Sequence, residues 1–478
     1  HHLAPTSTPR QEGIPTQYQQ LDSTISTTPH LIMVLPNFQC NNPACDEQSN
    51  SASATSTTSK SKCEFMEKCA SSCAAYGRVC PCAARGAGQA ACRAIDKLYT
   101  TDSNIFTEKP EFTKLNCEDL VISDKLGEGG FSVVHRVTLL HQNKDTASNK
   151  NSNNKYAVKY LKRKIMVEQH AFELGAADLA VEANFLAQLS HPNIVQLHGI
   201  TSGSVETNVA TGKECGFFIL IDLLKDTLEH KIEVWREQQK QDKGSILSRL
   251  SSDFKEKRKL ALMDRCKIAM QIADAMIYLH GRRIIYRDLK PDNIGFDDNG
   301  TVKLFDFGLA KELKKKHLDG TFKLTGNTGS RRYMAPEVAK EQHYGLPVDV
   351  FSFGILLHEL ASLEKPFLGY SANKHMIQVV MGGERPKIDS HHHFPMELQW
   401  LVKKAWSTEA EERPTFVAVK KCLQELVQDM GDSSAPKSPK FSRVGRYRST
   451  GQNTPNSSNS KSSSSNTTPP PGMKKKSM

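Results

Sequence analysis

The sequence YRDLKPDN, residues 286–293, places three chemically different groups within one short turn. Asp288 carries a carboxylate, Lys290 an ammonium two residues later, and Asn293 a carboxamide five residues after Asp288. Phosphoryl transfer from a nucleotide needs a carboxylate that orients the incoming hydroxyl and accepts its proton, together with cations that neutralise the phosphates. The turn therefore predicts Asp288 as the base, Lys290 on the transferred phosphate and Asn293 as a magnesium ligand.

A second carboxylate follows at Asp306, thirteen residues after Asn293, in the sequence DFG. It comes at the end of an apolar run, VKLF, which the turn Asn299-Gly300 separates from the run IGF. Asn-Gly between two apolar runs is a strong signal for a β-hairpin. DFG alone indicates an ordinary exit from a strand. Beside YRDLKPDN it indicates a second magnesium ligand, because Mg²⁺ prefers carboxylate oxygens.

Two features upstream predict a phosphate-binding region. The sequence LGEGGFSVVHRV starts at Leu126 and predicts a hairpin in which Gly127 and Gly129 let backbone amides approach an anion. Lys159 in YAVKY is a single cation in an apolar strand, where burial disfavours its charge unless it is paired. Glu182 lies among apolar positions of the next predicted helix, and we expect it to be that partner.

The chain from about residue 115 to residue 430 changes from strand-rich to helical. Runs of β-branched and aromatic residues predict strands at 156–161 and 217–221, among others. Apolar residues at helical spacing predict a helix around Phe185, a helix that ends at Gly281 and another around Phe353. We therefore predict an α+β, bilobal fold, with a small β-rich lobe, a larger helical lobe and YRDLKPDN at their junction.

Taken together and in this order, the motifs resemble those of eukaryotic protein kinases. The resemblance covers about residues 115–430, and its motifs are GEGGF with Val134, YAVK, Glu182, YRDLKPDN, DFG, MAPE (from Met334), DVFSFG (from Asp349) and Arg413. Each motif alone is weak, but all eight in sequence leave little room for coincidence. The resemblance implies ATP and Mg²⁺ as cofactors, with Mn²⁺ as an alternative ion, and protein substrates.

The resemblance also implies roles for single residues. Lys159, Glu182, Asp288 and Lys290 are the implied catalytic residues, and Asn293 and Asp306 the implied metal ligands. Glu337 is expected to pair with Arg413, and Asp349 to hold the catalytic loop from below. The implied ATP-binding residues are Leu126, Gly127, Glu128, Gly129, Gly130, Phe131, Val134, Ala157, Lys159, Ile221, Asp222, Leu224 and Gly295.

Lys290 in DLKPDN and the sequence SRRYMAPE, with Ser330 where Thr is usual, resemble serine/threonine kinases more than tyrosine kinases. The sequences HPNIVQLHGI and DVFSFGILLHELASLEKPF are most similar to the tyrosine-kinase-like group of serine/threonine kinases. The function implied is transfer of the γ-phosphate of ATP to protein Ser and Thr hydroxyls, in intracellular signalling. The alternatives are a catalytically silent kinase-fold scaffold and a P-loop nucleotidase, but no G-x-x-x-x-G-K-[ST] sequence occurs to support the second.

Three residues depart from the kinase pattern. Ser132 replaces the third glycine of the loop, and we expect only weaker contact with phosphate. Tyr286 replaces the usual His, and we expect its ring to pack on Phe307. Gly295 replaces the Leu that usually lies beneath the adenine. Loss of that side chain removes ~2 kcal/mol of apolar contact and predicts a roomier adenine pocket, unless a neighbour fills the gap.

Arg287, before the base, implies control by phosphorylation, because in such kinases this arginine binds a phosphate on the activation loop. The candidate acceptors are Thr321, Thr325 and Thr328, of which we favour the last two. An upstream activating kinase is therefore an implied partner.

The ends of the chain differ in composition from its centre. Residues 1–110 are predicted to be a low-complexity region with a cysteine-rich stretch at 63–92, and residues 431–478 a disordered Ser/Pro-rich tail. The tail has nine Lys or Arg against one Asp, which is +8 of the net charge of +11. The basic charge thus says little about the folded part, and we favour a solvated tail over nucleic-acid binding. Polar inserts at 141–155 and 236–260 are predicted to be surface loops, with a helical turn as an alternative within the second.

Of the 12 cysteines, four lie in the kinase-like region and eight before residue 93, six of which are close together. Cys117, Cys215, Cys266 and Cys422 are scattered through the kinase-like region, and we expect reduced thiols of a cytosolic protein. Cys63, Cys69, Cys73, Cys80, Cys82 and Cys92 are crowded, but their spacing matches no C-x-x-C pair of zinc ligands. We favour unpaired thiols there over a zinc site or a disulfide-clipped hairpin.

The sequence has no run of about 20 apolar residues, so it predicts no transmembrane segment. A cytoplasmic or, alternatively, nuclear location is expected. Because the chain starts with His1 and not with Met, the loss of a targeting segment before it is kept as an alternative.

Overall fold

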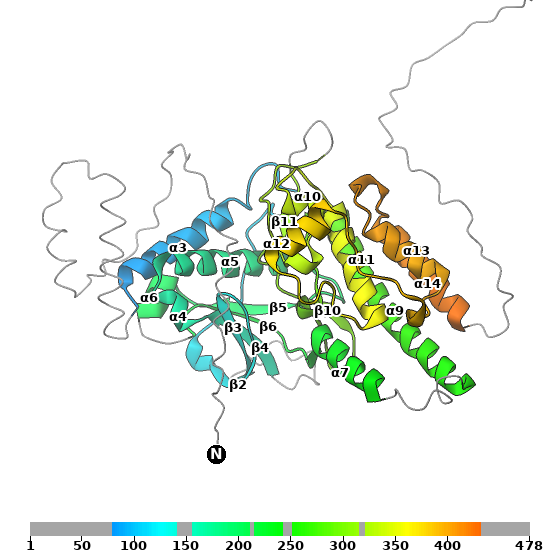
Figure 1. The fold of residues 1–478 in the computed structure, drawn as a ribbon. Coiled ribbons are helices and arrows are strands. Elements are labelled where there is room, and N and C mark those ends of the chain that lie inside the picture. The colour runs from blue at the N-terminus through cyan, green and yellow to red at the C-terminus, as the bar shows by residue number, and fades with distance from the viewer. Residues whose placement is uncertain (1–78, 141–154, 211–214, 242–250, 315–320, 432–478) are drawn as a thin grey trace, which may run out of the picture. The chain divides into compact units, whose positions relative to one another are not determined.

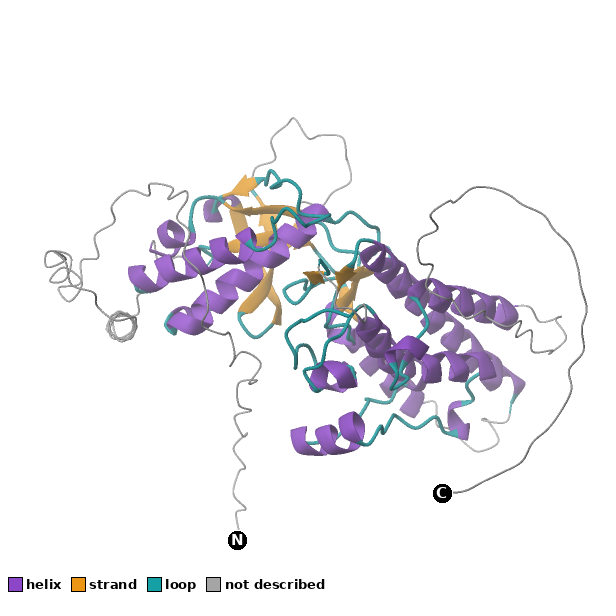
Figure 2. Ribbon diagram, turned by 90° about the horizontal axis from the view of Figure 1, so that it is seen from above, coloured by secondary structure: helices purple, strands orange, loops and turns teal. Residues whose placement is uncertain are grey.

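The computed structural model describes residues 79–140, 155–210, 215–241, 251–314 and 321–431. The predictions for the basic tail, for nearly all of the first insert and for Cys63, Cys69 and Cys73 lie outside the described residues. Strands gather in one part of the described residues and most helices in the other (Figure 2). The predicted α+β fold with two lobes is confirmed.

The small lobe is built on a six-stranded sheet with the order β1-β5-β6-β4-β3-β2. β2 and β3 form the predicted glycine-rich hairpin, and β4, which carries Lys159, pairs with both β3 and β6. Val137, Val158 and Leu220 are fully buried in one apolar cluster of this lobe, which fits their β-branched and aliphatic side chains. The strands are β1 (Lys114–Leu115), β2 (Leu120–Glu128), β3 (Ser132–Leu139), β4 (Lys155–Leu161), β5 (Leu197–Thr201) and β6 (Phe218–Asp222).

One long helix of this lobe, α5 (Gln169–Gln188), contacts β4, β5 and β6. Most of its apolar residues are buried, and Phe172 and Phe185 are fully buried. Glu182 lies among them and is 2% exposed, as its position between apolar residues predicts. Short helices precede and follow it in the chain, α4 (Arg163–Met166) and α6 (Val205–Ala210).

A helix from the N-terminal extension, α3 (Pro81–Asp96), lies along α5 (Figure 1). Its buried residues are small, namely Ala83, Ala84, Gly86, Ala87 and Ala91. Small residues let the two helix backbones approach closely. A side chain at Gly86 would come within 2.7 Å of the Glu173 carboxylate on α5. Residues that the sequence assigns to a low-complexity region therefore pack on the kinase-like region.

The large lobe is centred on α11 (Pro347–Ser362), in which every residue from Val348 onward is buried. α9 (Ser252–Gly281) begins where the Ser251 hydroxyl accepts the amide of Phe254, and it ends at Gly281 as predicted. The other helices are α7 (Leu228–Gln241), α10 (Pro336–Ala339), α12 (Ala372–Lys374), a π-helix (His375–Met381), α13 (Met396–Ala405) and α14 (Phe416–Gly431). Short 3-10 turns cover Cys117–Asp119, Pro291–Asn293, Arg331–Tyr333, Ser390–His392 and Ala410–Glu412.

Two small sheets lie where YRDLKPDN joins its surroundings. A three-stranded sheet with the order β10-β9-β7 contains the predicted IGF and VKLF hairpin, and β8 pairs with β11. These strands are β7 (Asp226–Thr227), β8 (Ile284–Ile285), β9 (Ile294–Phe296), β10 (Val302–Leu304) and β11 (Lys311–Glu312).

The prediction of a surface loop at 236–260 is largely wrong. α7 continues to Gln241 and α9 starts at Ser252, so that only residues 242–250 lie outside the described residues. The charged sequence hid the helices, because both expose most of their polar residues to solvent. Within the described part of the chain, no helix combines the length and the apolar character that crossing a membrane requires.

Candidate active site

The predicted ion pair of Lys159 is present and includes a third residue. The Nζ atom of Lys159 lies 2.6 Å from Oε2 of Glu182 and 3.1 Å from Oδ1 of Asp306. Burial acts against the charge of Lys159, but the two carboxylates outweigh it and raise the pKa of the ammonium. Burial also acts to raise the pKa of Asp306, yet the neighbouring Lys159 lowers it overall. Lysine and DFG aspartate are therefore both charged at neutral pH.

The Asp288 carboxylate is held by three donors. Oδ1 accepts the backbone amide of Ser330 at 2.8 Å, while Oδ2 accepts the Asn293 amide at 2.9 Å and lies 2.8 Å from the Lys290 ammonium. The same ammonium donates to the Ser330 hydroxyl at 2.8 Å. Asp288 is 9% exposed, so these contacts fix the orientation of a nearly buried carboxylate. The three predicted residues of YRDLKPDN thus lie together, and Ser330 joins them.

Ser330 was noted in the sequence only for its position before MAPE. Its place beside Asp288 depends on Gly329, which has a φ of +97°. A side chain there would overlap the carbonyl oxygen of Arg287, so a residue other than glycine would push the two loops apart. A glycine before the serine is the sequence signal that was available.

The catalytic loop is anchored from below by Asp349, as the resemblance implied. The Asp349 carboxylate is fully buried and accepts the amides of Tyr286 at 2.9 Å and Arg287 at 2.8 Å. His280 adds a third contact at 2.9 Å. Arg287 and Asp306 both have left-handed backbones, with φ values of +72° and +65°. Such conformations persist only where surrounding contacts impose them, as the contact of Asp349 with the Arg287 amide does for Arg287.

Tyr286 packs on Phe307 as predicted. The ring centroids are 5.2 Å apart and the planes are inclined by 70°, an edge-to-face arrangement. The Tyr286 hydroxyl donates to the carbonyl of Phe305, just before DFG. The unusual tyrosine therefore connects the catalytic loop to the DFG segment and takes no part in the acid–base cluster.

The glycine-rich hairpin closes where the amide of Gly129 donates to the carbonyl of Ser132 at 2.8 Å. Glu128 at the end of β2 is engaged by Lys125 and Lys162, each at 2.5 Å. Hydrogen bonds from these two lysines lower the pKa of Glu128 to about 2. The Glu128 carboxylate is therefore ionised and turned to protein cations, which leaves the glycine backbone as the part of the hairpin suited to phosphate.

The prediction of a roomier adenine pocket is wrong for the space next to Gly295, because a neighbouring side chain fills it. A Cβ atom at Gly295 would lie 2.5 Å from Cδ1 of Leu224 and 3.1 Å from the carbonyl oxygen of Asp226. Leu224, on the predicted hinge, already fills the space of the missing side chain. At Asp222 the backbone amide donates to the carbonyl of Gln196, which leaves the Asp222 carbonyl and the Leu224 backbone as the hinge groups predicted to contact adenine.

The activation-loop candidates lie close to Arg287. Its Nε donates to the carbonyl of Leu309 at 2.6 Å, and Nη1 contacts the Tyr344 hydroxyl at 3.3 Å, which in turn donates to the carbonyl of Thr325. Thr325 is exposed, and the Thr328 hydroxyl donates to the carbonyls of Thr325 and of Gly326. Thr321 is half-buried. Thr325 is therefore an exposed residue whose backbone carbonyl is linked to Arg287 through the Tyr344 hydroxyl, which is consistent with the role predicted for it.

Glu337 and Arg413 form the expected ion pair, with two parallel contacts of 2.5 Å and 2.9 Å. The Arg413 side chain is fully buried, and Nη1 also donates to the carbonyl of Pro347 at 3.1 Å. A bidentate pair of this kind joins the MAPE segment to the start of α11 and to the turn before α14.

The cysteine predictions are confirmed in part. Cys266 and Cys422 are free thiols, and burial raises the pKa of Cys266 to about 12. Cys117 and Cys215 instead form a disulfide, with a Cα–Cα distance of 6.2 Å, so the prediction of reduced thiols is wrong for this pair. The two residues are 98 positions apart in the sequence and meet only because the β-strand order brings their segments together.

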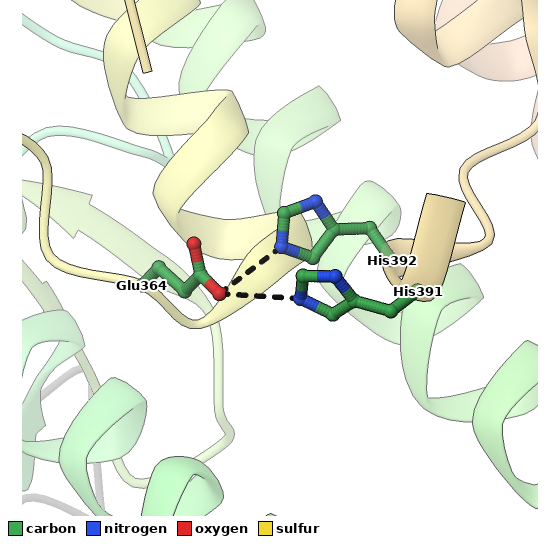
Figure 3. Close-up of side chains that lie close together, drawn as sticks. All are labelled: Glu364, His391 and His392. Atoms are coloured by element: carbon green, nitrogen blue, oxygen red, sulfur yellow. Dashed lines mark hydrogen bonds and ion pairs between the residues drawn. The ribbon is translucent and has the colours of Figure 1, made fainter. Parts of the chain in front are cut away.

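Cys80, Cys82 and Cys92 lie at and in α3, where Cys80 is buried, Cys82 half-buried and Cys92 exposed. Among the described residues, three ligand-type side chains converge only at Glu364, His391 and His392 (Figure 3). His392 Nε2 lies 3.2 Å from the Glu364 carboxylate, but its Nδ1 accepts the amide of Asp389 at 3.1 Å. An imidazole that accepts a hydrogen bond at Nδ1 carries its proton on Nε2, which leaves no lone pair there for a metal. The cluster is therefore a set of contacts of the Glu364 carboxylate with two imidazoles, at 3.4 Å for His391 and 3.2 Å for His392.

The cleft residues fit ATP with a divalent cation. Asn293 donates both of its side-chain hydrogen bonds through Nδ2, so its carbonyl oxygen stays available, and the Asp306 side chain is 45% exposed. A carboxylate and a carboxamide oxygen are the donors that Mg²⁺ prefers. Lys159 contacts Asp306, and Lys290 contacts Asp288 beside Asn293, so both ammonium groups lie close enough to this donor set to supply charge for phosphate oxygens.

A family model described as protein tyrosine and serine/threonine kinase matches residues 120–423. The chain belongs to this protein kinase family. The kinase fold and family membership predicted from the motifs are confirmed, as is the likeness to serine/threonine kinases of the tyrosine-kinase-like group.

Several curated proteins are similar over this region. Serine/threonine-protein kinase VIK of Arabidopsis thaliana is 33% identical over 260 residues, which cover 53% of this chain and 51% of VIK. Serine/threonine-protein kinase STY46 of the same plant is 34% identical, over 42% of this chain and 33% of its own length. Dual specificity protein kinase shkB of Dictyostelium discoideum is 37% identical, over 40% and 30% respectively. The chain thus spans about half or less of the length of these relatives.

Proposed function

We propose that the protein is a serine/threonine protein kinase, which transfers the γ-phosphate of ATP to Ser and Thr hydroxyls of other proteins. The observation that carries the proposal is the contact of Lys159 with both Glu182 and Asp306, since it joins three residues from separate elements in one charged cluster. A kinase-fold scaffold without activity has no need for this cluster, whose burial is costly.

The geometry gives each residue a distinct part. Asp288, held by Ser330, Asn293 and Lys290, has a fixed carboxylate that orients the acceptor hydroxyl and takes its proton. Lys159 binds phosphate oxygens of the nucleotide and is kept in place by Glu182. Asn293 and Asp306 would hold magnesium, which would supply positive charge to neutralise the phosphates.

Specificity for Ser and Thr is supported by the contact between Lys290 and the Ser330 hydroxyl at 2.8 Å. This contact places a cation beside the base, within reach of a phosphate on a short acceptor side chain. Three relatives named serine/threonine-protein kinases give the same indication.

The remaining parts of the proposal follow from the sequence and the contacts. We assign the nucleotide to the predicted hairpin and hinge residues, with Mg²⁺ as the ion, Mn²⁺ as its alternative and zinc outside this function. An upstream kinase that modifies Thr325 or Thr328 is the proposed activator. Proteins, not nucleic acids, are the proposed substrates, and the proposed location is cytoplasmic, with the nucleus as the alternative.

We also propose a folded catalytic unit that starts before residue 115. The packing of α3 on α5 supports the inclusion of α3 in this unit, whose last described helix is α14.

The test is transfer of labelled phosphate from ATP to generic protein substrates, followed by phosphoamino-acid analysis. We expect phosphoserine and phosphothreonine from the wild-type protein and background label from the variant Asp306→Ala. Equal label from both proteins, or phosphotyrosine as the main product, would contradict the proposal.

A further inference from the structure

A cavity of about 400 Å³ opens beside the Asp288 cluster. Its lining starts at Lys290 and Ser330, which are joined by a hydrogen bond next to Asp288, and continues with Arg331 and Arg332. Successive residues of an extended peptide are about 3.3 Å apart. A peptide with its acceptor hydroxyl at Asp288 therefore places a neighbouring side chain at this cavity.

The cavity wall is basic. Lys290, Lys365 and the two arginines face it, against one carboxylate, Asp292. Lys365 is neutralised by Glu229 through contacts of 2.6 Å and 2.7 Å, and Lys290 by Asp288. The excess positive charge therefore belongs to Arg331 and Arg332.

These two guanidinium groups are exposed, and within the described part of the chain neither has a side-chain hydrogen bond or an ion pair. Guanidinium groups bind carboxylates and phosphates through paired N–H donors. Surface arginines normally find such a partner or project freely into water. Here they border a cavity that already contains the acceptor site.

His375 supplies a buried polar group to the same cavity. It is 3% exposed, and its Nε2 atom has no hydrogen-bond partner among the described residues. Burial and the charges of Arg331 and Arg332 lower the pKa of His375 to about 4, so its ring is neutral at pH 7 and one nitrogen donates. His375 begins a π-helix (His375–Met381), an irregularity often found at functional sites.

We propose that this cavity binds an anionic side chain, a carboxylate or a phosphate, on the residue next to the acceptor Ser or Thr of the protein substrate. The inference rests on the proposed kinase function and adds a substrate class to it. Arg331 and Arg332 bind the anion, and His375 donates to it from the buried wall.

The test compares Ser-containing peptides that differ only at the residues flanking the acceptor, with Ala, Lys, Asp or phosphoserine. We expect kcat/KM at least about tenfold higher for the Asp or phosphoserine peptides than for the Ala peptide. In the variant Arg331→Ala/Arg332→Ala this ratio falls to within about twofold, while Lys421→Ala, an exposed charge on α14, keeps the wild-type ratio.

A preference for only one of the two anionic peptides identifies which anion the site takes. Similar rates on all peptides, or a preference that survives the double substitution, overturn the anion site and leave the kinase function standing. Transfer to none of the peptides, with ATP and Mg²⁺ present, contradicts the kinase function itself.

An independent set of contacts concerns the N-terminal extension after α3. Phe106 is 1% exposed and packs edge-to-face on Tyr99 and on Phe185 of α5, with centroid distances of 5.4 Å and 4.9 Å. The Tyr99 hydroxyl donates to Oδ1 of Asn184 at 2.8 Å. These contacts lie within one turn of Glu182 on the same helix.

The same extension also holds the segment that follows DFG. Glu312 of β11 is 4% exposed and accepts the Ser103 hydroxyl at 2.6 Å and the Asn104 amide at 2.7 Å. Lys314 donates to the carbonyl of Leu98 at 2.8 Å. One short stretch of chain therefore contacts both the helix with Glu182 and the strand six residues after Asp306.

We infer that residues 79–108 form a positioning clamp, which keeps Glu182 and Asp306 within reach of Lys159. This second inference also rests on the proposed function. Glu312 and Ser103 are its positioning residues, because they connect the extension to the DFG segment.

The clamp is tested with Ser103→Ala, Glu312→Gln, the double variant and the control Arg93→Ala, an exposed residue of α3. We expect each single substitution to lower kcat about three- to tenfold with little change in the KM for ATP, and the double variant to lose no more than the worse single one. Amide hydrogen exchange in α5 rises in parallel. Ser103→Thr, which keeps the hydroxyl, and Arg93→Ala behave as wild type.

Wild-type kcat and wild-type exchange in both single variants would overturn the clamp. The exchange measurement needs no catalysis, so it still decides the clamp if the wild-type protein transfers no phosphate, an outcome that would count against the kinase function alone.

Discussion

The catalytic loop at 286–293 and the clamp at 79–108 are visible in the sequence to very different degrees. The loop consists of charged and polar residues in a fixed order, each of which the chemistry needs. The clamp contacts α5 mainly through Ala83, Ala84 and Ala87, with Gly86 between them, residues that also occur in unstructured chains. The chemistry of a catalytic loop thus requires particular residue types in a fixed order, which can be recognised in a sequence. Close helix packing requires only that side chains be small.

The largest effect is expected from Asp306→Asn, which removes a charge from the predicted magnesium site and from the Lys159 cluster. We expect turnover to fall about 10³-fold, as for loss of a key charge-stabilising group, with little change in the free energy of unfolding. Steady-state kinetics and chemical denaturation measure the two quantities. If Asp306→Asn destabilised the fold as much as it slowed turnover, the cluster would be structural and the comparison would fail.

Phe106→Ala tests the opposite region. Phe106 is nearly fully buried between Tyr99 and Phe185, so its truncation is expected to cost about 3 kcal/mol of stability at the docked segment. Limited proteolysis should then cut between residues 79 and 108 before the rest of the protein. Thr101→Ala, at an exposed position in the same segment, is the control. Equal protease resistance of Phe106→Ala and wild type would show that the segment does not depend on this contact.

Glu359 extends the comparison to a buried carboxyl group that belongs to none of the sequence motifs. Burial raises its pKa from 4.5 to about 7, although Lys365 and the Tyr333 hydroxyl stabilise the carboxylate. The folded protein therefore holds this proton more tightly than the unfolded chain does, and stability falls as pH rises from about 4.5 to about 7. Glu359→Gln keeps an acceptor for Tyr333 and should remove a fall of up to ~3 kcal/mol.

The measurement is the free energy of unfolding of wild type and Glu359→Gln at pH 5 and pH 8. We expect the variant to be more stable than wild type at pH 8 and close to it at pH 5. The same pH dependence in both proteins would contradict the assignment of the effect to Glu359.

Tyr286→Phe has the smallest expected effect. It keeps the packing on Phe307 and removes the hydrogen bond to the carbonyl of Phe305, which is worth about 1 kcal/mol. We expect lower stability by about that amount and turnover within about threefold of wild type. A loss of turnover as large as that of Asp306→Asn would mean that the tyrosine acts in the chemistry.

Much of the site could be predicted from the sequence because charged residues in apolar surroundings are informative. Lys159 in an apolar strand and Glu182 in an apolar helix required a partner, and the structure joins them at 2.6 Å. Asp349 and Arg413 could be placed only through the family resemblance. Both sit where the structure now shows fully buried contacts.

Other features depend on three-dimensional neighbours and could not be predicted. Whether the gap at Gly295 stays open is decided by the side chain of Leu224, which lies about 70 residues earlier in the sequence. The disulfide of Cys117 with Cys215 depends on strand order in the same way. Glu312 carries no motif at all, and its importance appears only from the donors that surround it.

The most direct test of the central claim is single-turnover phosphate transfer by wild type and Asp288→Asn, each saturated with ATP and Mg²⁺. The asparagine keeps an oxygen for the amide of Ser330 but no longer accepts a proton. The account predicts unchanged nucleotide binding and a transfer rate at least about 10²-fold lower. A transfer rate equal to wild type would show that the carboxylate of Asp288 is not the base.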